Sequence, residues 1–423
     1  MSSGGHSVLL IRGGRVYTGC QEGGYQETGC QETGCQETGD TGTFLDILIK
    51  DGKISKIGNA GSFPTVHDME LIDATGLVVA PGLVDMHVHF REPGFEYKED
   101  ILTGAAAAAA GGVTTCCCMP NTSPVADNTE TVKSIVNKAK QAPIAVLPIG
   151  AVTIGQKGKE LTEFASLESA GVVALSDDGI PIYSDNVMRE ALRQANSNDI
   201  LIISHCEPEE LMAARDVRIA AETGTRVHIA HVSTADAVNT IHSAREAGIK
   251  VTAETCPHYF TLTESAVKSK GTLARMSPPL RTKKDIEAII SGLIDGTIDA
   301  IVTDHAPHSA EEKALPFDEA PNGIIGLETS LALALTFLYH AGKLGIDEII
   351  KLMSTQPAEI LKIEAGSLTE GGAADIVIFD PDEEWTVDPS LFKSKARNTP
   401  FDGMKLHGKV KYTISQGKIV YSD

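Results

Sequence analysis

The chain has 423 residues, of which 42% are hydrophobic and 22% are charged, a composition that suits a globular protein with a full-sized core. Its formal net charge of −21 argues against nucleic acid and anionic membrane surfaces as partners. No apolar run reaches the roughly 18 residues that a bilayer span requires. The first residues also lack the basic and apolar regions of a signal peptide. We therefore expect a cytoplasmic protein whose cysteines are reduced thiols.

The N-terminal part reads as short strands interrupted by a repeat. Residues 7–18 and 45–58 are predicted to form strands with glycine-containing turns. Between them, at 20–39, lies a pentapeptide repeat whose polar, glycine-rich composition cannot bury a core, which predicts a disordered or surface insertion. The alternative is a metal site formed by the repeat's cysteines, although no histidine or paired CxxC supports it. These cysteines are Cys20, Cys30 and Cys35.

From residue 81 to residue 365, short apolar runs alternate with helical patterns. The apolar runs span residues 83–89, 113–119, 144–152, 172–177, 200–205, 227–232, 251–256 and 300–305. Eight such units predict a (β/α)₈ TIM barrel. Strands return over 366–423, and we expect these to pair with the strands of 1–80 in one small β-domain beside the barrel.

Ionisable residues cluster where the apolar runs end, which is where barrel enzymes carry their active sites. His87 and His89 close the first run, and two residues apart on a strand they face the same side. Such a pair can share a divalent ion, but alone it fits two partly exposed histidines equally well. The other strand ends strengthen the metal hypothesis by adding Asp178, His205, His231 and Asp304.

Two further histidines require a choice. His228 and His231 are three residues apart, so on one strand they would face opposite ways. We assign His231 to the site because it lies nearer the strand's end, and His228 to a structural role. His258 stays open between packing and the rim of the site.

Several motifs occur together and in a fixed order. They are DMHVHFREPGFEYKED (85–100), GGVTTCCCMPNTSPV (111–125), SDDG (176–179), SHCE (204–207), HVST (231–234), SPPLR (277–281), TDHAPH (303–308) and APNGIIGLET (320–329). Jointly they resemble bacterial-type dihydroorotases of the amidohydrolase superfamily, from about residue 45 to the end of the chain.

The resemblance implies a binuclear zinc site. His87, His89 and Asp304 would bind one ion, His205 and His231 would bind the second, and Asp178 would bridge the two. The fourth run ends in Ser-Asp-Asp without a lysine, which is similar to the aspartate-bridged branch; motif position favours Asp178 over Asp177. A metal-bridged hydroxide would attack the ring carbonyl, with Asp304 as general acid and base.

The resemblance also implies substrate contacts. Arg91 lies two positions past His89 and can reach the same mouth, where it would hold a carboxylate together with Asn121. A surface salt bridge between Arg91 and Glu92 or Glu96 is the alternative. The remaining implied contacts are Ser277, His308, Pro321, Asn322 and Gly323. Ser277 stands where most relatives have asparagine, and the segment between His205 and His231 is shorter than in typical relatives.

The implied reaction is the interconversion of N-carbamoyl-L-aspartate and dihydroorotate in pyrimidine biosynthesis. Allantoinases, hydantoinases and dihydropyrimidinases are alternatives that would share the metals but need no carboxylate clamp such as Arg91. A non-catalytic homologue that supports aspartate carbamoyltransferase is another alternative, but such proteins typically lose metal ligands. A homo-oligomer and a complex with that transferase are further expectations from the family.

Overall fold

The computed structural model of the chain describes residues 8–19, 42–65 and 69–423. The pentapeptide repeat at 20–39 lies outside the described residues, and so do the three cysteines of the alternative metal site.

Eight parallel strands form the predicted barrel, and they follow one another in chain order around it. They are β6 (Leu83–Val88), β7 (Val113–Cys118), β8 (Ala145–Gly150), β9 (Ala174–Ser176), β10 (Leu201–Ser204), β11 (Val227–Ile229), β12 (Val251–Thr255) and β13 (Ala300–Ile301). A backbone hydrogen bond of 2.9 Å from His89 N to His305 O joins the first strand to the last. This contact closes the barrel and places His305, which follows β13, beside His89, which follows β6.

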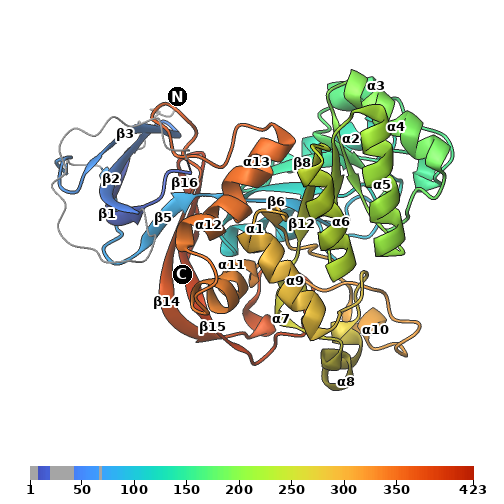
Figure 1. Cartoon of the computed structure of the whole chain (residues 1–423). Helices are drawn as coiled ribbons and strands as arrows, with labels where there is room; N and C mark the ends of the chain where they lie inside the picture. The colour runs from blue at the N-terminus through green and yellow to red at the C-terminus, as the bar shows by residue number, and fades with distance from the viewer. Residues whose placement is uncertain (1–7, 20–41, 66–68) are drawn as a thin grey trace.

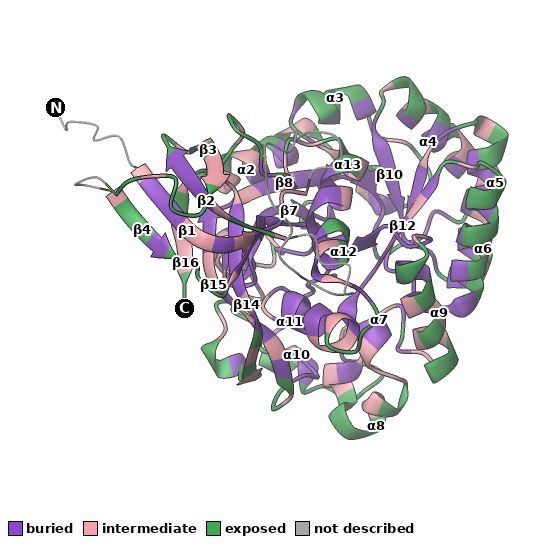
Figure 2. Cartoon of the chain, turned by 60° about the vertical axis from the view of Figure 1, so that its left-hand side comes forward, coloured by how far each residue is buried: buried purple, intermediate pink, exposed green. Residues whose placement is uncertain are grey.

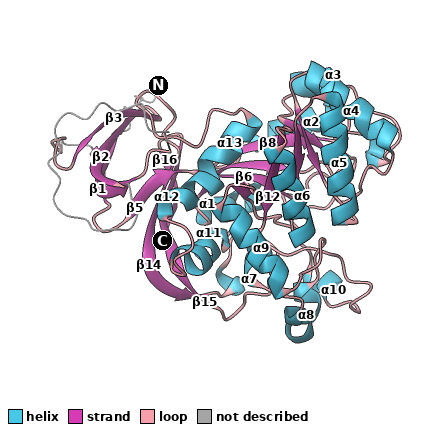
Figure 3. Cartoon of the chain, in the orientation of Figure 1, coloured by secondary structure: helices cyan, strands magenta, loops and turns pink. Residues whose placement is uncertain are grey.

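Helices surround these strands (Figure 3). The barrel helices are α1 (Ile101–Ala110), α2 (Thr129–Ala139), α3 (Phe164–Ser169), α4 (Asp185–Ser197), α5 (Glu209–Thr223), α6 (Ala235–Glu246) and α9 (Lys283–Ile294). Shorter helices are α7 (Pro257–Thr261), α8 (Ser265–Lys270), α10 (Ala310–Lys313), α11 (Ser330–Ala334), α12 (Ile346–Ile350) and α13 (Gln356–Leu361). No described helix is long and apolar enough to cross a membrane.

Helix α4 illustrates how the sequence specifies these elements. Ser184 caps its first turn by accepting the amide of Val187. Its buried residues recur at helical spacing and face the strands, while the opposite face is exposed (Figure 2). These buried residues are Met188, Ala191, Leu192 and Ala195.

A second sheet combines both ends of the described chain (Figure 1). Its strands are β1 (Val8–Val16), β2 (Thr43–Lys50), β3 (Lys53–Asn59), β4 (Met69–Asp73), β5 (Val78–Pro81), β14 (Ile376–Thr386), β15 (Lys405–Ser415) and β16 (Lys418–Ser422). The antiparallel pairing of β5 with β14 joins the two ends and confirms the predicted β-domain. Strands β4 and β5 were not predicted. The domain boundaries after residues 80 and 365 stay a prediction.

Candidate metal centre

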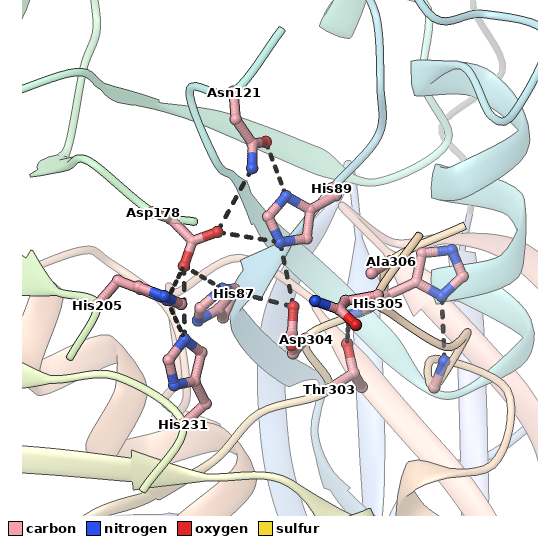
Figure 4. A network of polar contacts seen from close by, with 12 residues as sticks. His87, His89, Asn121, Asp178, His205, His231, Thr303, Asp304, His305 and Ala306 are labelled. Atoms are coloured by element: carbon pink, nitrogen blue, oxygen red, sulfur yellow. Dashed lines mark hydrogen bonds and ion pairs between the residues drawn. The ribbon is translucent and has the colours of Figure 1, made fainter. Parts of the chain in front are cut away.

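Four histidines and two aspartates converge at the carboxyl ends of five barrel strands (Figure 4). Two groups of side chains could each hold a metal ion, because within each group the potential ligand atoms all lie within 4.8 Å of one another. Asp178 belongs to both groups. The groups are His87, His89 and Asp178, and Asp178, His205 and His231. Asp304 adjoins the first group. All six side chains are buried.

The first group is oriented by outer hydrogen bonds. His87 Nδ1 lies 2.6 Å from a carboxylate oxygen of Glu254 on β12, so that its Nε2 faces the centre. His89 Nδ1 lies 2.8 Å from Asn121 Oδ1, and its Nε2 lies 3.1 Å from Asp304 Oδ1 and 3.4 Å from Asp178 Oδ2. The outer contacts therefore fix which ring nitrogen of each histidine is directed inward.

The second group meets on one oxygen atom. His205 Nδ1 and His231 Nε2 lie 3.4 and 3.5 Å from Asp178 Oδ1, and 2.8 Å from each other. His87 Nε2 lies 3.4 Å from that same oxygen. A single carboxylate thus connects the two groups.

The separations between the histidines and Asp178 match the geometry of a tetrahedral metal ion. Two ligands at about 2.0–2.1 Å from zinc, at tetrahedral angles, are about 3.3 Å apart. Four histidine nitrogens lie 3.4 to 3.5 Å from the oxygens of Asp178. Imidazole nitrogen and carboxylate oxygen are also donors that zinc accepts. The residues present fit a divalent ion of this kind.

The electrostatics of the cluster favour a bound cation as well. Burial alone would lower the pKa of His87, but the carboxylates of Asp178 and Glu254 outweigh it and raise that pKa well above its ordinary value. Burial likewise opposes protonation of His205, whose pKa the contact with Asp178 raises to about 9. Buried carboxylates thus hold positive charge in this centre, and a metal ion can supply it in place of protons.

Two inward-facing atoms have no hydrogen-bond partner in the part of the chain that the structure describes. They are His87 Nε2 and Asp178 Oδ1, and both are buried. Leaving a buried polar atom unpaired costs roughly 1–3 kcal/mol. Coordination of an ion would remove that cost from both atoms.

Glu254 and His228 lie behind the cluster. The sequence predicted a structural role for His228, but Glu254 was not predicted. His228 Nε2 lies 3.1 Å from the second carboxylate oxygen of Glu254, and His228 Nδ1 lies 2.8 Å from the hydroxyl of Thr252. Glu254 is fully buried and connects His228 to His87. His231 reaches the cluster because β11 ends at Ile229, so strand alternation does not extend to it.

The backbone is strained at three of the predicted site residues. Arg91, His231 and Asp304 have φ values of +63°, +35° and +47°, whereas only eight described residues other than glycine have positive φ. Such conformations cost of order 1–3 kcal/mol each and cluster at functional sites. The strain therefore points to the same end of the barrel as the ligand geometry does.

Arg91 lies at the mouth without an acidic partner. Its Nε donates to the backbone oxygen of Pro307 at 3.2 Å. Among the described residues it forms no ion pair: Glu92 pairs with Lys138 at 3.7 Å, and Glu96 accepts a backbone amide. Burial lowers the pKa of Arg91 to about 10. The surface salt bridge considered from the sequence is absent among the described residues, although the charges of Asp304, Asp178 and Glu312 still favour the protonated guanidinium.

His308 is a neutral ring beside Arg91. Burial, followed by the charges of Arg91 and Lys98, lowers its pKa to about 3. The contacts assign its tautomer: Nε2 donates to Asn322 O at 2.8 Å, and Nδ1 accepts from Lys98 Nζ at 3.3 Å. Glu312 lies 2.8 Å from the Lys98 ammonium and balances its charge. Of the two cations beside His308, Lys98 therefore has a carboxylate as ion-pair partner, and Arg91 has none among the described residues.

The other predicted contacts are more dispersed. The Asn121 amide donates weakly to Asp178 at 3.5 Å, in addition to its contact with His89. The Ser277 hydroxyl donates to Glu207 at 3.4 Å, on the side of the second group. Pro321, Asn322 and Gly323 lie on the loop that accepts the His308 hydrogen bond.

One alternative considered from the sequence lies away from the cluster. Asp177 points the other way from Asp178 and accepts the backbone amides of Val152 and Thr153 at 2.9 and 3.0 Å.

His258 is buried beside the cluster, and its ring centroid lies 4.2 Å from that of Tyr259. Burial lowers its pKa to about 4, and the charges of Asp304 and His231 also act on it. Its Nε2 has no hydrogen-bond partner among the described residues. Packing and a place at the rim of the site therefore both describe His258.

Comparisons with known proteins agree with this geometry. The profile of the Amidohydrolase family matches residues 78–420. Dihydroorotase of Acetivibrio thermocellus is 48% identical over 409 residues, covering 90% of this chain and 95% of the relative. Dihydroorotase of a Thermoanaerobacter species is 49% identical over 406 residues, covering 89% and 93% of the two chains.

Solved structures share the fold over nearly the whole chain. L-hydantoinase (dihydropyrimidinase) from Arthrobacter aurescens aligns with a TM-score of 0.85 at 25% identity, covering 98% of this chain and 96% of that chain. Dihydropyrimidinase from Brevibacillus agri aligns with a TM-score of 0.84, also at 25% identity, covering 98% and 95% of the two chains. A family profile that spans the barrel and relatives that match most of the length lead to one conclusion: the chain belongs to the amidohydrolase family.

Proposed function

We propose that the chain is a dihydroorotase, which interconverts N-carbamoyl-L-aspartate and dihydroorotate in pyrimidine biosynthesis. The observation that carries this proposal is the convergence of four histidines and two aspartates beside an arginine that lacks an acidic partner. The curated dihydroorotases at 48% and 49% identity, matched over most of their lengths, support the same reaction.

We propose that two zinc ions occupy the cluster. His87, His89 and Asp304 would hold one ion, His205 and His231 would hold the other, and Asp178 would be shared. Support comes from the sharing of Asp178 Oδ1 by nitrogens of both groups. Zinc bound there supplies an activated water molecule and polarises the carbonyl of the substrate.

Asp304 is the proposed proton carrier. In the hydrolytic direction its carboxylate accepts a proton from the attacking water and returns it to the ring nitrogen as the carbon–nitrogen bond breaks. In the biosynthetic direction it accepts a proton from the carbamoyl nitrogen as that nitrogen attacks the side-chain carboxyl group, and water leaves. Its position beside His89, at 3.1 Å, supports this role.

The substrate's α-carboxylate is the proposed partner of Arg91. A planar guanidinium holds a carboxylate through two parallel hydrogen bonds, and no carboxylate of the described residues forms an ion pair with Arg91. Asn121 is the proposed second donor, with Ser277 as a further contact near the second ion. His308 and the backbone of Pro321, Asn322 and Gly323 would contact the edge of the pyrimidine ring.

A hydantoinase or dihydropyrimidinase is the second candidate, since the solved neighbours carry those names. Their substrates carry no carboxylate on the ring, so they leave the charge of Arg91 without a counterpart. A non-catalytic homologue is disfavoured because all six ligands are present and assembled. The higher identity to dihydroorotases also favours the first proposal.

Three further proposals concern the chain's surroundings. We propose a homo-oligomer and, from the family, association with aspartate carbamoyltransferase; independent elution of the two proteins from a size-exclusion column would contradict that association. A cytoplasmic location is supported by the five described cysteines, which are free and buried.

A substrate comparison tests the proposed function. The metal-replete protein is assayed side by side on dihydroorotate, dihydrouracil, hydantoin and allantoin, and its zinc content is measured. We expect turnover of dihydroorotate far above that of the three others. Preference for an uncharged ring would reject the dihydroorotase assignment in favour of the second candidate.

A further inference from the structure

A segment of the small β-domain reaches the mouth of the barrel. Residues 392–401 lie between β14 and β15, and within them Asn398 is only 3% exposed. Its side-chain amide donates to the backbone oxygens of Ala306 and Gly323, each at 3.1 Å. Its side-chain oxygen accepts the amide of His308 at 3.1 Å. One side chain thus joins the chain after β13 to the loop at 321–325.

Lys313 holds the same loop from the barrel side. It lies at the end of α10, is 5% exposed, and forms no ion pair among the described residues. Its ammonium donates instead to the backbone oxygens of Pro321 at 2.9 Å, Gly323 at 3.0 Å and Arg275 at 3.3 Å. All three ammonium hydrogens therefore have acceptors, and all three acceptors are main-chain atoms.

The loop has little regular structure of its own. It joins the barrel through an isolated bridge between His305 and Ile324, and Gly323 has a φ of +125°. A Cβ atom on Gly323 would lie 2.6 Å from the Cβ of Ala306, so the loop packs tightly against the chain after β13. The Gly323 oxygen accepts from both Asn398 and Lys313, which makes it the point where the two supports meet.

We propose that Asn398 and Lys313 are positioning residues that fix the 321–325 loop in the shape that contacts the substrate ring. The inference rests on the proposed function, because it concerns the loop assigned there to the pyrimidine edge. It goes further by making the C-terminal part of the small β-domain a component of the active site. Preorganised backbone contacts lower the entropy lost on binding, so loosening them weakens substrate binding more than it slows the chemistry.

The test separates KM from kcat in the zinc-loaded, full-length enzyme. Asn398→Asp keeps the shape and the acceptor but replaces both donated hydrogen bonds with repulsion between oxygens. Lys313→Met keeps most of the side-chain volume and removes all three hydrogen bonds. We expect each variant to raise KM for dihydroorotate about tenfold. We also expect kcat to stay within about threefold of wild type and zinc content to be unchanged.

Thr399→Val is the matched control. Thr399 is the buried neighbour of Asn398, and its hydroxyl accepts only the amide of Phe401 within its own turn. We expect this variant to lose thermal stability while keeping the wild-type KM.

The outcomes distinguish the two proposals. An active wild type together with an unchanged KM in Lys313→Met and in any folded Asn398→Asp would overturn the inference alone. If Asn398→Asp does not fold, Lys313→Met decides the matter. A wild type that holds zinc but does not turn over dihydroorotate would overturn the proposed function, and this inference with it.

Discussion

Asp304, the proposed proton carrier, has a carboxylate oxygen 3.1 Å from His89 Nε2 and 3.6 Å from His87 Nε2. Replacing Asp304 by alanine removes the carrier and leaves the hydrophobic core intact, so we expect kcat to fall by about 10²- to 10⁴-fold with little change in the folded structure. Steady-state kinetics and circular dichroism measure the two effects. Asp304→Asn, which keeps an oxygen ligand, separates proton transfer from metal retention; near-normal turnover in either variant would refute the role.

Arg91 is predicted to contribute to substrate binding. Arg91→Ala deletes a charge-assisted hydrogen-bonding group, so we expect KM for carbamoyl aspartate to rise roughly 10- to 100-fold. Arg91→Lys retains the charge without the planar fork and should give an intermediate KM. An unchanged KM in Arg91→Ala, measured in the same assay, would show that another group holds the carboxylate.

Glu254 is predicted to govern how tightly the first ion is held. Glu254→Gln keeps the shape but removes the anion that makes His87 a stronger ligand, so zinc affinity should fall by about 10- to 100-fold. Competition with a chromogenic chelator measures this affinity independently of activity. Asp46→Asn is the control, because Asp46 is another fully buried carboxylate and, among the described residues, accepts the amides of Gly13 and Gly61 in the small β-domain, away from the metal-binding groups. Equal zinc affinity in the two variants would contradict the prediction.

The proposed metal ligands that could be named from the sequence share one property, namely a place at the end of a predicted strand. His87 and His89 were found in this way, because strand ends meet at one face of a barrel. Lys313 and Asn398 carry no such local signal, whereas Glu254 lies near the end of the predicted run at 251–256 but was not singled out. The roles of these three residues depend on partners 10, 92 and 167 positions away, and even the nearest of these contacts needs the folded loop. Only tertiary structure shows them.

At the scale of elements, all eight barrel strands were predicted, but most were predicted too long. The run at 300–305 forms only a two-residue strand, β13, because the chain turns at Asp304 with positive φ. Apolar patterns mark burial, and buried chain continues past the last ladder hydrogen bond. Strands β4 and β5 escaped prediction, and β4 carries little apolar signal because three of its five residues are exposed.

Glu328, just before α11, makes stability depend on pH. Its carboxylate accepts the amides of Lys393 and Ser394 at 2.9 and 3.1 Å, and burial raises its pKa from 4.5 to about 7. The folded protein therefore holds a proton here that the unfolded chain releases at lower pH. As pH rises from 4.5 to 7, this group lowers the free energy of unfolding, by about 2 kcal/mol.

Glu328→Gln removes that titration. Urea denaturation at pH 4.5 and at pH 7 measures the free energy of unfolding at both ends of this interval. We expect that free energy to fall by about 2 kcal/mol less in the variant than in wild type. Parallel pH dependence in the two proteins would mean that Glu328 does not titrate there.

At the scale of the whole molecule, the proposed metal centre brings together residues from five strands of the barrel. These residues lie at the ends of β6, β9, β10, β11 and β13, so removing bound ions would leave the buried carboxylates of Asp178 and Asp304 without the cations that offset their charge. We expect chelation to lower Tm by about 5 °C, given a free-energy loss of about 4 kcal/mol. Differential scanning calorimetry with and without a chelator measures this shift. It should be smaller in His205→Ala, and a chelator-insensitive Tm at verified zinc loss would contradict the expectation.

The pairing of β5 with β14 also has a consequence for biosynthesis. On the ribosome, β1 to β5 emerge first, and the whole barrel is translated before the strand that completes their sheet appears. Domains of a nascent chain fold as they emerge, so the barrel can form before β14 is available to pair with β5. Asn398 arrives with that late segment. On the inference drawn above, tight substrate binding is therefore complete only after this segment has been made.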